Sequence, residues 1–314
     1  MAQQQPAALD PATALEQTAW ALAALIATQT EAARTPLSDV LNSAPERTAV
    51  LEAAGLLQRD GDDLVPHPAL VAFSGPQAEN SAAAKLSSLR QAVAAAAGEA
   101  GVADGWSGHS DEVVLNQGRA SAGTGAALAT RIVPELAGLT DRLAVPGSRI
   151  LDVGTGVGAL AVALARNLPQ VEVTGIDVLE HVLDLARREI AAASDVASRV
   201  SVRLQDVADL DERGTYELVW LPAPFLSETS LTKALPRVVD ALVPGGWLVI
   251  GTNATSADPL QIAVSRWTAL RNGGNTFDTD RMAATLTSAG LSDVQRFPTV
   301  PGGPILVAAR HQGS

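Results

Sequence analysis

The chain of 314 residues has no cysteine, one tyrosine, two methionines and an aromatic content of only 3%. Without cysteine the protein cannot form a disulfide, a thiolate metal site or a cysteine nucleophile. Nothing in that absence conflicts with a reducing cytosol, so we expect a cytoplasmic protein. No tight cluster of histidines and carboxylates is evident among the four histidines and 34 acidic residues, so we expect no metal site.

Positive charge is also scarce, with 22 lysines and arginines against 34 acidic residues and a formal net charge of −12. Nucleic acids and anionic membranes attract proteins of the opposite sign, so we expect neither as a partner. The sequence has no run of about 18 uninterrupted apolar residues, and its first ten residues, MAQQQPAALD, lack a basic segment followed by an apolar one. A small molecule is therefore the expected partner.

The most informative stretch is RILDVGTGVGALAVALA, residues 149–165. An apolar strand pattern ends there in glycines at Gly154, Gly156 and Gly158 and continues directly into an alanine-rich helix pattern. Glycines allow a tight turn at positive φ and a close approach of the backbone to a ligand, and the start of the helix offers free N–H groups. This turn is suited to a nucleotide-like cofactor.

Strand and helix patterns alternate beyond Gly147, which is typical of a parallel sheet covered on both faces. The last two strand patterns, residues 293–300 and 304–310, are separated by only three residues, Pro301, Gly302 and Gly303. Three residues are too few for a parallel crossover, so these strands must be antiparallel. The expected strands are residues 149–154, 171–178, 200–206, 216–221 and 247–252, with helices at 157–167, 180–193, 229–242, 258–270 and 279–289.

Three acidic residues distinguish this pattern from a dinucleotide-binding sheet. Asp152 lies inside the first strand, where its carboxylate can meet a ligand's ammonium group. Asp177 ends the second strand and can accept both hydroxyls of a ribose. Asp206 ends the third strand, where it can accept from an adenine amino group while Val178 and Val207 pack on the ring. Since the carboxyl ends of neighbouring parallel strands meet at one edge, the cofactor that fits is S-adenosylmethionine.

Residues 147–310 resemble the class I S-adenosylmethionine-dependent methyltransferases. LDVGTGVG resembles the first motif of that family, IDV at 176–178 the ribose-binding motif, QDV at 205–207 the adenine motif, and LVPGGWLVI at 242–250 the turn before the fifth strand. The resemblance implies an α/β, Rossmann-like seven-stranded sheet of order 3-2-1-4-5-7-6 with an antiparallel last strand.

The segment before this sheet has the outline of a winged helix. Helical patterns cover residues 11–31 and 36–42, a third helix is expected from Pro45 with Ser43 as its cap, and a hairpin follows at 56–66. The helix equivalent to a DNA-recognition helix has little basic surface, which disfavours DNA binding. An N-terminal segment of this kind resembles that of small-molecule O-methyltransferases, which implies dimerisation and closure over the substrate.

Further helices are expected at 81–97, from Asp111 to a break near residues 123–125, and at 126–143. The predicted domains are a mainly helical, winged-helix-like dimerisation and lid domain at 1–100, a helical linker and lid at 101–145, and the S-adenosylmethionine-binding methyltransferase domain at 146–314.

The resemblance and the residue types together give a set of expected site residues. The expected cofactor-binding residues are Asp152, Gly154, Thr155, Gly156, Asp177, Val178, Asp206, Val207 and Leu221. Expected substrate contacts are Gln117, Arg119, Pro222 and Phe225. Residues 216–225, YELVWLPAPF, stand where the fourth motif of the family falls. No histidine follows them, although plant-type O-methyltransferases carry one there, so the general base is left open, with Glu228 and His109 as candidates.

The expected function is methyl transfer from S-adenosylmethionine to a small molecule in a homodimeric enzyme. The favoured acceptor is a hydroxyl oxygen of a secondary metabolite or quinone-like compound. The residues 221–225, LPAPF, lack the polar acceptor of the Asp/Asn-Pro-Pro-aromatic motif, which disfavours nucleic-acid N-methylation. Two alternatives remain open, a non-catalytic or regulatory S-adenosylmethionine-binding protein and an NAD-dependent oxidoreductase.

Overall fold

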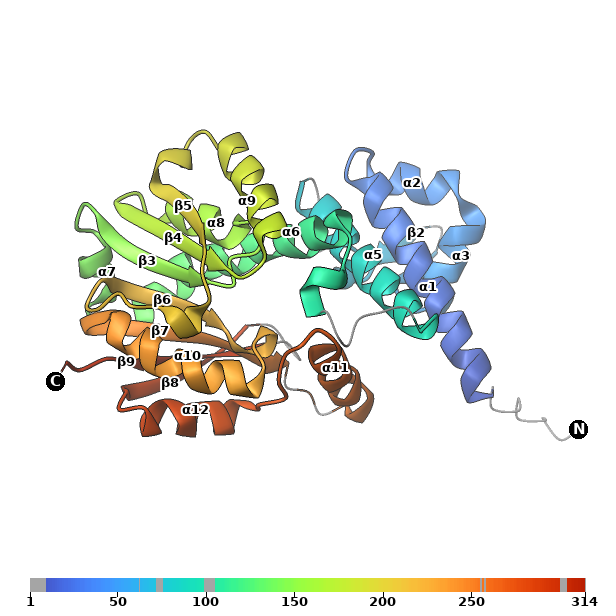
Figure 1. The fold of residues 1–314 in the computed structure, drawn as a ribbon. Helices are drawn as coiled ribbons and strands as arrows, with labels where there is room; N and C mark the ends of the chain where they lie inside the picture. The colour runs from blue at the N-terminus through green and yellow to red at the C-terminus, as the bar shows by residue number, and fades with distance from the viewer. Residues whose placement is uncertain are drawn as a thin grey trace, which may run out of the picture. The chain divides into compact units, whose positions relative to one another are not determined.

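The computed structural model describes residues 10–61, 63–71, 76–98, 105–254, 256, 258–299 and 304–313. The chain divides into two compact units, Met1–Val93 and Ala94–Ser314 (Figure 1). The roles predicted for residues 1–100, 101–145 and 146–314 stay predictions. Among the described residues, no helix combines the length and the apolar character needed to cross a bilayer.

The first unit contains the three helices and the hairpin in the predicted order. Its elements are α1 (Pro11–Ala32), α2 (Leu37–Ser43), α3 (Pro45–Ala53), the antiparallel pair β1 (Leu57–Asp60) and β2 (Asp63–Pro66), α4 (Pro68–Val71) and most of α5 (Pro76–Ala96). A small core holds them together, formed by Leu41, Leu51, Leu57 and Leu70. The α5 helix begins five residues before the predicted start.

The predicted cap of the third helix is wrong. Ser43 is the last residue of α2, and its hydroxyl donates to the carbonyl of Val40 at 3.0 Å. The residue at the cap position of α3 is Ala44, which offers no side-chain hydrogen bond. Only one residue separates the two helices, so the serine bonds back to its own helix and Pro45 alone fixes the start of α3.

The second unit is a seven-stranded sheet covered by helices. Its elements are η1 (Gly105–Gly108), α6 (Asp111–Ala127), η2 (Leu128–Ile132), η3 (Val133–Glu135), α7 (Leu139–Leu143), β3 (Ser148–Val153), α8 (Ala159–Asn167), β4 (Val171–Asp177), α9 (Glu180–Ala192), η4 (Ala197–Arg199), β5 (Val200–Leu204), η5 (Val207–Asp209), β6 (Tyr216–Pro222), η6 (Ala223–Phe225), α10 (Glu228–Ala241), β7 (Leu242–Ala254), α11 (Pro259–Arg271), α12 (Thr279–Ser288), β8 (Ser292–Pro298) and β9 (Pro304–Arg310).

The strand order β5-β4-β3-β6-β7-β9-β8 is the predicted 3-2-1-4-5-7-6. Within this sheet, β3, β4, β5, β6 and β7 pair in parallel, whereas β9 is antiparallel to both β7 and β8. This arrangement confirms the α/β fold class and the closing hairpin.

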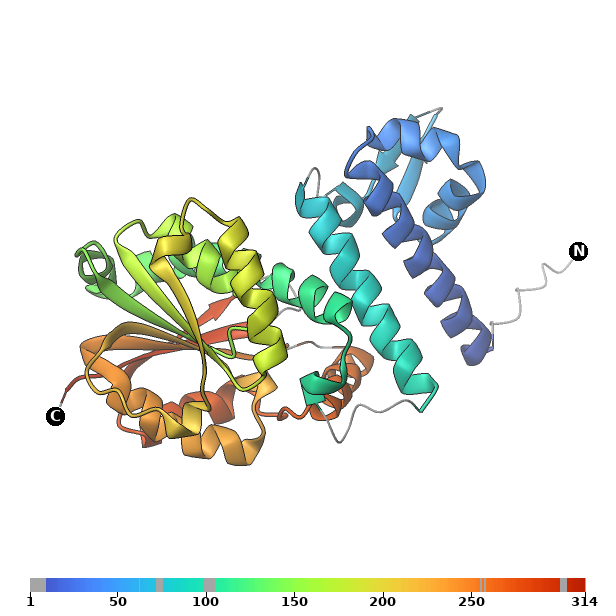
Figure 2. The same cartoon turned by 45° about the horizontal axis from the view of Figure 1, so that its top comes forward.

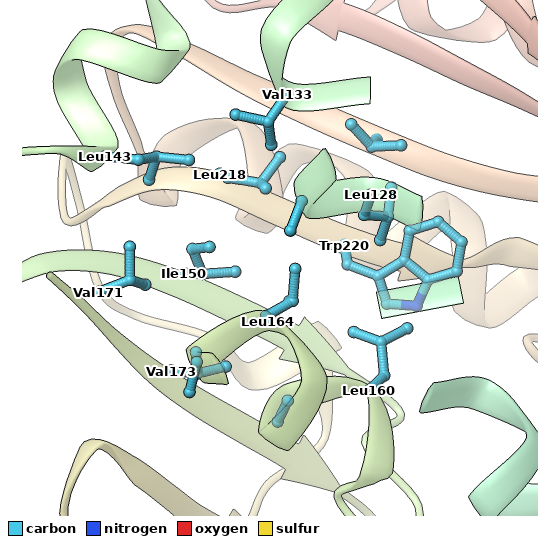
Figure 3. Close-up of a cluster of buried hydrophobic side chains, with 14 of the residues drawn as sticks. Leu128, Val133, Leu143, Ile150, Leu160, Leu164, Val171, Val173, Leu218 and Trp220 are labelled. Carbon is cyan, nitrogen blue, oxygen red and sulfur yellow. The ribbon is translucent and has the colours of Figure 1, made fainter. Parts of the chain in front are cut away.

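Each face of the sheet has its own apolar core. Residues of α8 and α9 pack on one face and residues of α10 and α12 on the other, which gives three layers (Figures 1 and 2). Figure 3 shows the first core, where Leu160 and Leu164 of α8 lie against Ile150 and Trp220 of the sheet. This packing leaves the carboxyl ends of the strands and the loops that follow them to form the site.

Two helix predictions before the sheet are wrong. The α6 helix runs without interruption through Gly123 and Gly125. A Cβ atom at Gly125 would lie 2.6 Å from the carbonyl oxygen of Leu160, so this glycine serves close packing of α6 on α8 rather than a helix break. The single helix expected at 126–143 is instead a π turn, a 3₁₀ turn and the short α7, because Pro134 and the left-handed Gly138 (φ 73°) interrupt it.

Candidate active site

The glycine-rich turn joins the end of β3 to the start of α8. Gly154, Gly156 and Gly158 all have positive φ, at 62°, 56° and 77°, a conformation that favours glycine. Two backbone bonds of 3.0 Å brace the turn, one from the N–H of Thr155 to the carbonyl of Ile176 and one from the N–H of Gly158 to the carbonyl of Thr155. The turn is therefore a rigid cradle whose glycines leave room for a ligand.

Asp152 lies under this turn and is only 1% exposed. Its carboxylate accepts a hydrogen bond of 2.7 Å from the hydroxyl of Thr155. The pKa of Asp152 is raised to about 7, chiefly by burial and also by the charge of Asp177, while the hydrogen bond from Thr155 acts in the opposite direction. A cationic group bound nearby would favour the ionised form of Asp152, so the arrangement fits the ammonium group of a ligand.

Gly175 of β4 makes room for this hydrogen bond. It pairs in register with Asp152, and a Cβ atom there would lie 2.5 Å from the Thr155 hydroxyl oxygen. A larger residue would push Thr155 away from the carboxylate. The glycine is thus part of the cradle although it lies outside the glycine-rich motif.

Asp177 stands at the end of β4 and is tied to the same turn. One carboxylate oxygen accepts from the N–H of Gly156 at 3.0 Å and the other from the N–H of Leu179 at 3.1 Å. Burial raises the pKa of Asp177, and the backbone hydrogen bonds oppose that shift. Each carboxylate oxygen can accept a second bond, so the oriented group is able to receive two ribose hydroxyls.

The residues predicted to surround an adenine ring differ in exposure. Val178 is 58% exposed and presents an apolar surface beside Asp177, while Val207 is 6% exposed and belongs to the sheet core. Leu221, expected beside the methionine part of the cofactor, is fully buried in the same core. Asp206 follows β5, is exposed, and accepts from the N–H of Ala208 at 2.9 Å. The contacts of these four residues with a cofactor stay predictions.

The end of β6 lies beside the glycine turn. The ring of Pro222 would be 3.5 Å from a Cβ atom at Gly154. Just beyond, the amide of Asn275 donates to the carbonyl of Ala223 at 2.7 Å and to that of Leu226 at 2.8 Å, which fixes the η6 turn. Phe225 at the end of this turn is 56% exposed.

An aromatic cluster continues from Phe225. The ring of Trp106 contacts Phe225 edge-on at a centroid distance of 5.7 Å and His109 at 5.1 Å. The Nε2 atom of His109 lies 3.0 Å from the Oδ1 atom of Asn272. His109 and Phe225 were expected from the sequence as separate candidates, and the structure brings them together through Trp106.

Asn272 was missed by the sequence reasoning. It lies 163 residues from His109 along the chain and belongs to no motif, so only the folded chain places the two side chains together. The one available signal is the neighbouring pair Gly273 and Gly274, which marks a close approach of backbones. A Cβ atom at Gly274 would overlap the carbonyl oxygen of Pro224, at 1.8 Å.

The remaining candidates have protein partners. Arg119 of α6 forms a bidentate ion pair with Glu189 of α9, at 2.9 and 2.7 Å. Glu228 pairs with Arg281. Gln117 is half-buried on α6, the helix whose Gly118 lies against the glycine turn. The proposed contacts of Gln117 and Arg119 with a ligand, and the role of Glu228 as a base, stay predictions.

The family comparison agrees with this geometry. Residues 150–246 match the model described as a methyltransferase domain. This segment is a methyltransferase domain. It contains the glycine-rich turn, all three carboxylates and the loop after β6, and the sheet around it has the class I strand order.

Relatives and solved structures extend the likeness. A release factor glutamine methyltransferase from Rhodopirellula baltica is 33% identical over 118 residues, which are 37% of this chain and 38% of that protein. This chain spans between 38% and 65% of the first four curated relatives it matches.

Two solved structures resemble nearly the whole chain. An O-methyltransferase family protein from Burkholderia thailandensis has a TM-score of 0.66 at 19% identity, covering 98% of this chain and 100% of that one. Human N-acetylserotonin methyltransferase in complex with S-adenosylmethionine has a TM-score of 0.65 at 16% identity, with the same coverage. The likeness is one of fold, and it includes the helical unit before the sheet.

Proposed function

We propose that the protein is an S-adenosylmethionine-dependent methyltransferase of small molecules, with a hydroxyl oxygen as the favoured acceptor. The observation that carries the proposal is the arrangement of Asp152 and Asp177 around one braced glycine turn inside a methyltransferase domain. When bound, the cofactor supplies an electrophilic methyl group on a sulfonium.

The residues of the turn fit this cofactor by their chemistry. Asp152 is a buried carboxylate matched to an ammonium group, and Asp177 is an oriented double acceptor matched to a ribose diol. The exposed Val178 adds an apolar surface for an adenine ring. With Asp206 after β5, the expected cofactor contacts follow the carboxyl ends of three adjacent strands.

Three observations support a small-molecule acceptor over a macromolecule. The net charge of −12 disfavours nucleic acid. The loop after β6 carries Leu221 and Ala223 where an amide-recognising motif has a polar residue and a second proline. Two solved structures, of an O-methyltransferase family protein and of N-acetylserotonin methyltransferase, share the architecture of almost the whole chain. Pro222 and Phe225 then face the acceptor, and in-line transfer requires its nucleophile about 3 Å from the methyl carbon.

We also propose that the N-terminal segment, residues 1–100, forms a dimerisation and lid domain of winged-helix type, with residues 101–145 as a helical linker. Leu15 and Trp20 on α1 are 64% and 75% exposed, and such apolar side chains are typical of an interface. A homodimer and a cytoplasmic location are part of the proposal.

Calorimetry with S-adenosylhomocysteine tests the cofactor assignment. Wild-type protein should bind it, and Asp177→Ala should weaken binding at least tenfold because two acceptor bonds are lost. Asp209→Ala, an exposed carboxylate on the neighbouring loop, serves as the matched control and should bind like wild type. Equal affinity of the wild type and Asp177→Ala would refute the assignment.

Turnover decides between the enzyme and a non-catalytic cofactor-binding protein. A panel of phenols, amines and carbon acids is incubated with the protein and S-adenosylmethionine, and methylated products are sought by mass spectrometry. A phenol should gain one methyl group. Tight cofactor binding with no methylation of any panel member would favour the regulatory alternative.

A further inference from the structure

We propose that His109, oriented by Asn272, is the general base that takes the proton from the acceptor hydroxyl. The inference rests on the proposed methyltransferase function and supplies the residue that the loop after β6 lacks. A hydroxyl must lose its proton as it attacks, and residues 222–241 contain no histidine. In that segment, the carboxylate of Glu228 pairs with Arg281 and that of Asp240 with Arg213.

The hydrogen bond to Asn272 selects the tautomer of His109. The Oδ1 atom of an asparagine amide can only accept, so the Nε2 atom of His109 at 3.0 Å must donate its proton. In a neutral imidazole the other nitrogen, Nδ1, then carries the lone pair. His109 is thereby prepared as a proton acceptor, and Asn272 is a positioning residue.

Two further contacts hold the ring in place. Trp106 packs against His109 with a centroid distance of 5.1 Å and an interplanar angle of 56°. The backbone N–H of His109 donates to the carbonyl of Trp106 at 3.3 Å. The packing of the two rings and this backbone bond together hold His109 on the turn that precedes α6.

Asn272 is itself fixed beside the loop after β6. Gly274 leaves space for the Pro224 carbonyl, and Asn275 bonds the same turn. On the other side, a Cβ atom at Gly105 would lie 3.3 Å from the Asn272 carbonyl oxygen. The end of α11 thus bridges η1 and η6, and it carries the side chain that holds His109.

A continuous line of contacts leads from the cofactor turn to the base. Gly154 adjoins Pro222, which begins the η6 turn that ends in Phe225. Phe225 contacts Trp106, and Trp106 contacts His109. The exposed face of Phe225 and the ring of Trp106 together suit a flat aromatic acceptor whose hydroxyl reaches Nδ1 of His109.

The proposed step balances without a further reactant. The proton of the acceptor O–H passes to Nδ1 of His109, and the oxygen's electron pair forms the new bond to the methyl carbon. The electron pair of the broken sulfur–methyl bond stays on sulfur, which becomes a neutral thioether. The imidazolium of His109 then returns its proton to the solvent.

The test uses 4-nitrophenol as the probe, because its phenol and phenolate forms absorb at different wavelengths. The probe is added to full-length protein saturated with S-adenosylhomocysteine, at a pH where the free probe is mostly protonated. The wild type should raise the ionised fraction of the bound probe several-fold. His109→Gln should abolish that increase, and His67→Gln in the first unit is the control that should keep it.

Asn272 variants separate positioning from folding. Asn272→Ala should lower the ionised fraction, whereas Asn272→Asp, which retains an acceptor for Nε2–H, should restore it. Long-range proton–nitrogen NMR on the four histidines should show His109 with an unprotonated Nδ1 in the wild type and a mixture of tautomers in Asn272→Ala.

The outcomes distinguish the two proposals. If S-adenosylhomocysteine fails to bind the wild type, the proposed function falls. If it binds but 4-nitrophenol does not, or if the probe ionises equally in the wild type and His109→Gln, only the role of His109 is overturned. A proton on Nδ1 of His109 in the wild type would also overturn it.

Discussion

The hydroxyl of Thr155 donates to the buried carboxylate of Asp152 at 2.7 Å, which links the glycine turn to the strand beneath it. The carboxyl group of Asp177 lies nearby. Both carboxyl groups are therefore poorly hydrated, and burial raises the pKa of each. In the free protein the ionised forms of these two groups are thus destabilised, and a bound cation would stabilise them.

The raised pKa of Asp152 makes the stability of the protein depend on pH. Its pKa is about 7 in the folded protein against 3.8 for the ordinary side chain. Well below pH 3.8 the carboxyl is neutral in both states, but as pH rises toward 7 the unfolded chain ionises first. The Asp152 contribution therefore lowers the free energy of unfolding across this window, by up to about 4 kcal/mol.

Asp152→Asn should remove this loss, so that the variant exceeds the wild type in stability at pH 8 but not at pH 4. Denaturant unfolding at both pH values measures the difference, with Asp209→Asn as the exposed control. If the gap between the variant and the wild type were the same at both pH values, the assignment of the pKa shift to Asp152 would be wrong.

Gly123 and Gly125 of α6 offer a matched pair. A Cβ atom at Gly123 meets nothing within 4 Å, whereas one at Gly125 would meet the Leu160 carbonyl oxygen at 2.6 Å. Gly123→Ala should stabilise the protein by about 0.5–1 kcal/mol. Gly125→Ala should destabilise it by about 1–3 kcal/mol, because α6 must move off α8. Thermal or urea unfolding measures both, and effects of the same sign would contradict the packing described.

Val178 and Val145 are equally exposed, at 58% each, but only Val178 adjoins the cofactor site. Val178→Asp should weaken S-adenosylhomocysteine binding about tenfold, because it replaces an apolar contact with a charge near Asp177. Val145→Asp should leave the affinity unchanged, and both variants should unfold within about 0.5 kcal/mol of the wild type. If calorimetry showed that the two variants bind S-adenosylhomocysteine equally well, Val178 would not be part of the cofactor site.

The ion pair between Glu228 and Arg281 should contribute little to folding. The two side chains are 58% and 56% exposed, so a double-mutant cycle with Glu228→Gln and Arg281→Gln should give a coupling below about 1 kcal/mol. Turnover of any phenol methylated by the wild type should persist in Glu228→Gln. A loss of a hundredfold or more would instead make Glu228 the base.

Most of the sheet was predictable because its signals are local. Apolar strand patterns with Asp152, Asp177 and Asp206 at or near their carboxyl ends marked three neighbouring strands, and the three residues between the last two strand patterns excluded a parallel crossover. The glycine turn was recognisable because three alternating positions with positive φ favour glycine, and the sequence has glycine at each of them.

Contacts between distant segments were not predictable in the same way. A glycine that breaks a helix and a glycine that lets two helices touch look alike in sequence, so Gly125 was misread. Ser43 could have capped the helix after it but bonded to the helix before it. The pairing of His109 with Asn272 depends on how η1 and the end of α11 meet, which no local pattern encodes.

Gly118 allows α6 to approach the glycine turn closely. A Cβ atom at this position would lie 2.5 Å from a methyl group of Val157, so the backbone of α6 rests directly on the glycine turn. A larger side chain at position 118 would therefore push α6 and Val157 apart. The shape of the glycine turn thus depends on a residue of α6 that lies outside the glycine motif.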